Sequence, residues 1–222
     1  MRILLAAAAI ALVAAAPAAD PLQSKLIADA KLFPPSTLSF TRNVTMTQTG
    51  DGKTEKSVRV DRWDGKQWTL VSVDGKPPSA DEAAKFRKET AGRPVPGYYR
   101  LAGYLNAPAS RVTDAQGNTV LKIAKLPSGS VDMAGDRSDK FGGEAVVATA
   151  GPTTYVKQLR VSAREPFRLM VVAKIDRFDI VNDYALGKAG RPVVVRSVQE
   201  YAGSRPGESG TVRNEVVYSY DG

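Results

Sequence analysis

The chain of 222 residues contains no cysteine and no histidine. Without cysteine it has no disulfide, no thiol nucleophile and no lipid-modified N-terminal cysteine. Without histidine it has no Ser-His-Asp or Cys-His catalysis and no histidine-ligated zinc or haem. Carboxylate, lysine and tyrosine chemistry remain. We expect a protein that is not an enzyme and has no metal site and no cofactor.

The chain also lacks a long hydrophobic run. Its apolar stretch from Ile3 to Val13 is too short and too rich in alanine for a stable membrane anchor. Arg2 precedes this stretch and Ala16-Pro17-Ala18 follows it, which is typical of a secretory signal peptide. We expect a signal peptide over residues 1–18 and a single exported, periplasmic domain over residues 19–222.

Basic residues outnumber acidic ones. Without Arg2 the chain has 30 basic and 23 acidic residues, a net charge of +7, which favours anionic lipid headgroups or glycans. The basic residues are spread along the chain, which is equally typical of an ordinary solvated surface. Export and the lack of an RNA-binding or helix-turn-helix signature argue against nucleic acid as a partner.

The stretch from Leu38 to Gly75 has the clearest pattern. Asp51-Gly52, Asp64-Gly65 and Asp74-Gly75 supply residues that tolerate positive φ, and the first two separate alternating segments rich in β-branched and aromatic residues. This pattern predicts a β-meander, and the later segments predict more strands of the same antiparallel sheet.

The hydrophobic pattern also predicts the register of this meander. A two-residue turn at Asp64-Gly65 and a three-residue loop at 50–52 gather one set of side chains on a single buried face: Phe40, Arg42, Val44, Met46, Val58, Val60, Val71 and Val73. The opposite face then carries Arg59, Asp61, Trp63, Trp68 and Leu70. A sheet that is apolar on both faces needs covering on both.

Three segments are predicted to be helical. The first runs from Pro21 to Phe33 after the capping residue Asp20, and the second covers about Ala80 to Glu89 after a capping-box pair. The third, Tyr98 to Leu105, fits a helix face, although its tyrosines also fit a strand.

Further strands are expected in the rest of the chain, with a bulge near Asp176: Ser110–Thr113, Thr119–Lys125, Glu144–Thr149, Thr153–Ala163, Phe167–Ile180, Pro192–Ala202 and Thr211–Tyr220. These segments predict a mainly β (α+β) fold in which a long, curved antiparallel sheet wraps around short helices.

Two groups of side chains are candidate sites. Asp176, Asp179 and Asp183 are the densest carboxylate group and suggest calcium binding or acid-base chemistry, but they lie in no calcium-loop pattern and alternate along a strand. Trp63 and Trp68 could form an aromatic ligand contact, but a pair of side chains that covers the opposite face of the sheet under a helix is the commoner explanation.

The start of the mature chain resembles a known family. After a signal peptide and an amphipathic helix, SFTRNVT opens the meander and VRVDRW ends its second strand, which is similar to the periplasmic lipoprotein carriers and their outer-membrane receptor relatives. This resemblance implies an unclosed β-barrel, or half-barrel, lidded by short helices around an acyl-binding cavity. Arg62 occupies the place of the arginine that holds the lid closed in the carriers.

We therefore expect a non-enzymatic protein that binds a lipid or lipoprotein acyl chain between the sheet and the helices. The candidate ligand-binding residues are Phe40, Val44, Val58, Val60, Arg62, Val71, Phe86 and Leu101. The same residues would also build a close-packed core without a cavity. The alternatives are an envelope adaptor or stress-sensing module that binds another protein and a carboxylate-based hydrolase.

Overall fold

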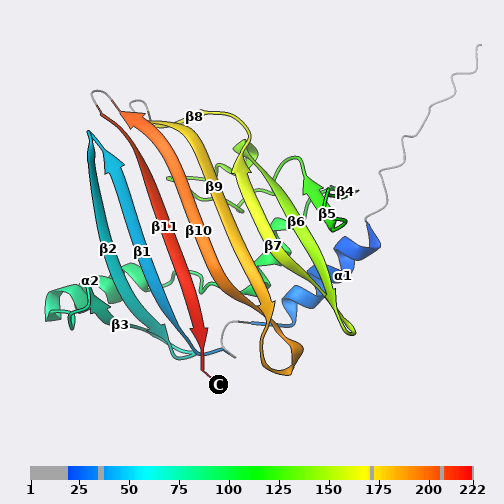
Figure 1. The fold of residues 1–222 in the computed structure, drawn as a ribbon, viewed down its shortest axis with the longest axis horizontal. Helices are drawn as coiled ribbons and strands as arrows, with labels where there is room; N and C mark the ends of the chain where they lie inside the picture. The colour runs from blue at the N-terminus through cyan, green and yellow to red at the C-terminus, as the bar shows by residue number, and fades with distance from the viewer. Residues whose placement is uncertain (1–19, 35–37, 171–172, 206–207, 222) are drawn as a thin grey trace, which may run out of the picture.

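The computed structural model describes residues 20–34, 38–170, 173–205 and 208–221. Within them, eleven strands form one antiparallel sheet in the order β3-β2-β1-β11-β10-β9-β7-β6-β5-β4, and β8 pairs with β9 beside this path (Figure 1). In the described residues no ladder joins the edge strands β3 and β4, so the sheet is an unclosed half-barrel. The predicted signal peptide lies outside the described residues.

The strand bounds agree closely with the predicted mainly β fold. They are β1 Phe40–Gly50, β2 Lys53–Trp63, β3 Trp68–Val73, β4 Ala109–Thr113, β5 Thr119–Ile123, β6 Phe141–Ala150, β7 Thr153–Ala163, β8 Phe167–Met170, β9 Ala173–Leu186, β10 Pro192–Arg205 and β11 Glu208–Tyr220.

The three predicted helical segments are confirmed. They form α1 (Pro21–Lys31), α2 (Ala80–Thr90), and a 3-10 turn, η2 (Tyr98–Arg100), that continues into α3 (Leu101–Tyr104). α1 begins where the Asp20 carboxylate accepts hydrogen bonds from two backbone N–H groups of its first turn, at 2.8 and 3.1 Å. None of the described helices is long and apolar enough to cross a membrane.

The helices pack on one face of the sheet, which we call the inner face; the opposite face is the outer face. Figure 1 shows α1 and α2 behind the sheet, away from the tips of the β1–β2 and β10–β11 hairpins. The Tyr98 hydroxyl accepts a hydrogen bond from the Val156 N–H of β7 at 2.9 Å, which joins η2 to the sheet. The fully buried side chains of this core include Leu26, Phe40, Leu101, Leu105, Leu121, Phe141 and Leu159.

The first hairpin corrects the predicted register. Gly50 pairs with Lys53, so the loop is the two-residue turn Asp51-Gly52, whose residues have φ of 50° and 74°. Two positive φ angles define the turn that best matches the twist of paired strands. Val44 is consequently opposite Arg59, because turn geometry outweighs the gain from pairing two valines.

The second hairpin loop is longer than predicted, whereas the first is shorter. Trp63 pairs with Trp68 across a four-residue loop, in which the Asp64 carboxylate accepts hydrogen bonds from the N–H groups of Lys66 and Gln67, both at 2.8 Å. A bulge at Val71 follows, between two consecutive pairs of the β2–β3 ladder.

These two loops change which side chains are buried. Val58, Val60 and Val71 point to the outer face, while Val73 packs against the core. Three side chains that were expected on the other face are buried beneath α2, around Phe86: Trp63, Trp68 and Leu70. The predicted four-valine face is therefore wrong, and the real inner face is aromatic.

The predicted strand Phe167–Ile180 is two strands. β8 ends at Met170 and β9 begins at Ala173, and the two pair as an antiparallel hairpin. The predicted bulge is confirmed, because β10 pairs with Arg177 and then with Ile175 and skips Asp176. The change of hydrophobic parity along this segment marks that bulge.

Candidate functional site

The predicted ligand-binding residues lie on opposite faces of the sheet. Phe40, Val44, Phe86 and Leu101 are buried on the inner side. Phe40, for example, packs edge-on against the Trp68 ring at 5.6 Å between centroids. These four residues belong to the packed core between the sheet and the helices, and ligand contact by them stays a prediction.

The other four predicted residues lie on the outer face. Val58 and Val60 point away from the helices, and Val71 is 46% exposed. Arg62 donates a hydrogen bond from Nη1 to Oδ1 of Asp221 at 2.9 Å, just beyond the end of β11. The predicted placement of Val58, Val60 and Val71 on the face that the helices cover is wrong, because the observed loop lengths reverse their direction. Ligand contact by these valines and by Arg62 stays a prediction.

A buried ion cluster occupies the inner face instead. Arg42 donates two hydrogen bonds to the Asp61 carboxylate, from Nε to Oδ1 at 2.7 Å and from Nη2 to Oδ2 at 3.1 Å. Arg59 Nε also donates to Oδ2 of Asp61, at 3.1 Å. The Asp61 side chain is fully buried, and that of Arg42 is 14% exposed. The Arg42 guanidinium lies 3.9 Å from the centroid of the Trp68 ring, and that of Arg59 lies 5.3 Å from Phe86.

The inner face continues beyond the helices toward the hairpin tips, where it forms a hollow of about 540 Å³. We call it the inner hollow. Its apolar lining consists of Leu169, Ile175, Tyr201 and Val212. This volume lies within the range of small-molecule sites. On β1, Met46 precedes the hollow on the same face and is 44% exposed, so apolar surface is uncovered there.

A row of three glycines crosses the floor of the inner hollow. Gly50 on β1 pairs with Gly210 on β11, which pairs with Gly203 on β10. A Cβ atom added at Gly203 or Gly210 would lie 2.5 Å from a backbone oxygen of the neighbouring strand, so only glycine fits at those two positions. The floor at this level is bare backbone, which leaves the space above it open.

Aromatic side chains connect the inner hollow to the core. The Tyr201 ring stacks on Phe178 with 5.9 Å between centroids, and Phe178 packs edge-on against the buried Phe141 at 5.4 Å. Polar and charged side chains also line the hollow: Gln48, Asp51, Lys53, Glu55, Lys174 and Glu208. A lining with both apolar and charged side chains suits an apolar chain that carries a polar end.

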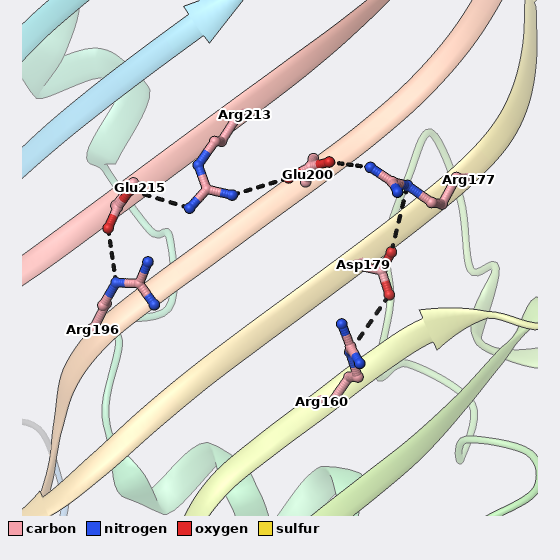
Figure 2. Close-up of polar contacts among 7 residues, drawn as sticks. All are labelled: Arg160, Arg177, Asp179, Arg196, Glu200, Arg213 and Glu215. Atoms are coloured by element: carbon pink, nitrogen blue, oxygen red, sulfur yellow. Dashed lines mark hydrogen bonds and ion pairs between the residues drawn. The ribbon is translucent and has the colours of Figure 1, made fainter.

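The predicted carboxylate group lies outside this hollow and forms ion pairs. Asp176 pairs with Lys174 at 2.5 Å. Asp179 belongs to a ladder of charges on the outer face (Figure 2), and Asp183 pairs with Arg196 of that ladder at 3.4 Å. The ladder alternates in sign across four strands, in the order Arg160, Asp179, Arg177, Glu200, Arg213, Glu215 and Arg196. In the described part of the chain, no group of three or more acidic side chains is placed to hold a metal ion.

Replacing Glu215 by glutamine is expected to lower the free energy of unfolding by about 0.5–1 kcal/mol at pH 7. Hydrogen bonds from Arg196, and then from Arg213, hold the pKa of Glu215 below its ordinary value of 4.5. A carboxyl with a depressed folded-state pKa stabilises the fold above its ordinary pKa, and this stabilisation disappears as the pH falls through the folded-state value. Urea unfolding at pH 7 and at pH 3 measures the difference.

Glu55→Gln is the matched control, because Glu55 is exposed on the same sheet and belongs to no ion pair of the described residues. The Glu215→Gln effect should shrink at pH 3 and in 1 M salt, since surface charges are screened. An equal loss at pH 3 and pH 7 would assign the effect to packing.

Sequence reasoning did not find the inner hollow or the Asp61 cluster. The hollow is built from two hairpin tips and from β8 and β9, which lie far apart in the sequence. The sequence feature that could have indicated the hollow is glycine at three positions beside hairpin turns, at 50, 203 and 210. The Asp61 cluster could be predicted only from the correct β1–β2 register, which places Arg42 opposite Asp61.

Comparisons with known proteins do not assign the chain to a family. No protein-family model and no curated protein matches the chain. Among solved structures, a DUF1329 family protein from Desulfovibrio piger ATCC 29098 matches with 13% identity, over 90% of this chain and 92% of that one, and a TM-score of 0.25. At that TM-score the likeness supports no conclusion about function.

Proposed function

We propose that this protein is a non-enzymatic periplasmic protein that binds the acyl chain of a lipid or lipoprotein in the inner hollow. The observation that carries the proposal is the hollow itself, with an apolar lining, a glycine floor and an aromatic connection to the core. Each methylene moved from water into such a lining contributes about 0.8 kcal/mol. The resemblance of SFTRNVT and VRVDRW to the lipoprotein carriers supports the same class of ligand.

Val212→Trp is expected to weaken binding of a fluorescent fatty-acid or lipopeptide probe by at least about tenfold. Val212 lines the inner hollow, so an indole there takes the space of the chain. Val58→Trp is the matched control, because Val58 lies on β2 with its side chain on the outer face. It should bind the probe as the wild type does, and circular dichroism checks that both variants fold.

Two outcomes would contradict the proposal. In the first, the wild type would take up no probe at protein concentrations of tens of micromolar. In the second, folded Val212→Trp would bind the probe as well as Val58→Trp does. If the proposal holds, mass spectrometry of a lipid extract from natively purified protein identifies the chain that is bound.

A second candidate function is an envelope adaptor that binds another protein by strand addition. β3 pairs with β2 only from Arg59 to Trp63. At Val58, the next residue of β2, Asp74 satisfies both backbone groups: its N–H donates to the Val58 carbonyl and its carboxylate accepts from the Val58 N–H, both at 2.7 Å. The edge of β2 from Lys53 to Ser57 has no partner strand among the described residues. Such an edge accepts an extended peptide, and this function becomes the better one if no probe binds.

A further inference from the structure

A second hollow, which we call the outer hollow, lies on the opposite face of the sheet from the acyl-chain site. Its volume is about 580 Å³, and β4, β5, β6 and β7 line it. The cross-strand pairs Lys122–Glu144 and Glu144–Arg160 place these three side chains on one face. Arg164, just beyond β7, completes the charged lining.

The outer hollow carries an excess of positive charge. Lys122, Arg160 and Arg164 line it, with Glu144 as the one acidic side chain of that lining. Lys122 Nζ pairs with Glu144 at 3.1 Å. Two guanidinium groups therefore remain without a carboxylate inside the hollow.

The partners of these two arginines lie outside the hollow and hold them weakly. Arg160 ends the outer-face ladder (Figure 2). Its Nε lies 3.7 Å from Asp179, and that carboxylate is also 3.8 Å from Arg177 and accepts a hydrogen bond from Ser162 Oγ at 2.7 Å. Arg164 forms no ion pair within the described residues, and its Nη1 lies 3.5 Å from the backbone carbonyl of Asp139.

Bare backbone lies between the cationic groups. Gly142 pairs with Ser162 on this face, and a Cβ atom there would lie 3.8 Å from Cγ of Arg164 and 3.1 Å from the Ile123 carbonyl. The absence of a side chain at Gly142 leaves open the space beside the Arg164 side chain. The hydroxyl of the exposed Ser110 lies at the β4 side.

We propose that the outer hollow binds a phosphate group, held by the guanidinium forks of Arg160 and Arg164 with Lys122 nearby. Arginine forks match the oxygens of phosphate in two parallel hydrogen bonds. A phosphomonoester carries a charge of about −1.5 to −2 at pH 7, which matches three cations and one carboxylate better than a single carboxylate ligand does. The phosphate belongs either to a soluble phosphomonoester or to the headgroup of an anionic phospholipid.

The test measures binding of two probes to the mature protein: glycerol 3-phosphate by NMR titration, and phosphatidylglycerol–phosphatidylcholine vesicles by co-sedimentation. Arg160→Gln and Arg164→Gln should each weaken binding by about tenfold, the loss of one charge-assisted contact. Ser110→Glu, on an exposed edge strand, should abolish binding by adding a carboxylate to the hollow. Arg87→Gln on α2 removes the same charge from an exposed arginine on the other side of the sheet and should leave binding unchanged.

The proposal is supported if the variants in the outer hollow lose binding of either probe while Arg87→Gln retains it. A response to glycerol 3-phosphate identifies a soluble ligand, and a response to vesicles alone identifies a lipid headgroup. The proposal is overturned if neither probe binds, or if Arg164→Gln binds as Arg87→Gln does. The acyl-chain proposal is independent of both results, because it depends on the variant Val212→Trp, which lies on the inner face.

Discussion

Asp61→Leu is expected to lower the free energy of unfolding by about 3–5 kcal/mol. The change leaves the Arg42 guanidinium between the sheet and α2 with no carboxylate, although its side chain is only 14% exposed. An uncompensated charge in such a place is far more costly than a lost surface pair. Denaturant unfolding followed by tryptophan fluorescence measures the change, since Trp68 lies 3.9 Å from Arg42.

The double variant Arg42→Met with Asp61→Leu tests the cause. It removes both buried charges and keeps apolar volume, so most of the lost stability should return. Arg59, whose side chain is already 39% exposed, can turn to solvent. The explanation fails if the double variant is as unstable as Asp61→Leu alone, because the loss would then come from packing.

Local signals predicted the fold well. Asp20 caps the start of α1 as predicted, and the predicted capping box before α2 is formed by Ser79 and Glu82. The alternating segments became strands with closely similar bounds. A change of hydrophobic parity located the bulge at Asp176. These features depend on a few neighbouring residues, which is the range over which sequence patterns determine structure.

Register was the point at which sequence reasoning failed. A shift of one residue exchanges the two faces of a strand, and the choice between a two-residue and a three-residue loop before Lys53 was enough to exchange them. The hydrophobic pattern was misleading because both faces of β2 carry side chains suited to burial. Asp61 and Arg59 look solvent-facing in the sequence. In the folded chain Arg42 and Arg59 both donate hydrogen bonds to the Asp61 carboxylate, and Arg59 lies over the Phe86 ring.

The structure does not bring the predicted ligand-binding residues together, for the same reason and for one more. Val58, Val60 and Val71 moved to the outer face with the register. Phe40 on β1 and Leu101 on α3 were correctly placed between the sheet and the helices, but close packing there leaves their side chains fully buried. The open space lies where the helices end, and helix length relative to strand length is a property of the whole fold.

Leu101→Ala is expected to lower the free energy of unfolding by about 2–5 kcal/mol and to leave the affinity for the acyl probe unchanged. Leu101 is fully buried in α3, which packs against α1, and truncation leaves a cavity that the surrounding helices only partly fill. Val71→Ala, at a position 46% exposed on the outer face, should change stability by less than about 0.5 kcal/mol. Urea unfolding of the two variants provides the comparison.

Probe binding by the same Leu101→Ala protein, measured where it remains folded, separates the two possible positions of the ligand. A chain bound in the inner hollow touches Val212 and Tyr201 and not Leu101, so Val212→Trp weakens binding while Leu101→Ala affects stability alone. If Leu101→Ala instead weakens binding as much as Val212→Trp does, the acyl chain must reach between the sheet and the helices. That outcome would require α3 to move away from α1 when the ligand enters, because close packing leaves Leu101 fully buried in the structure described.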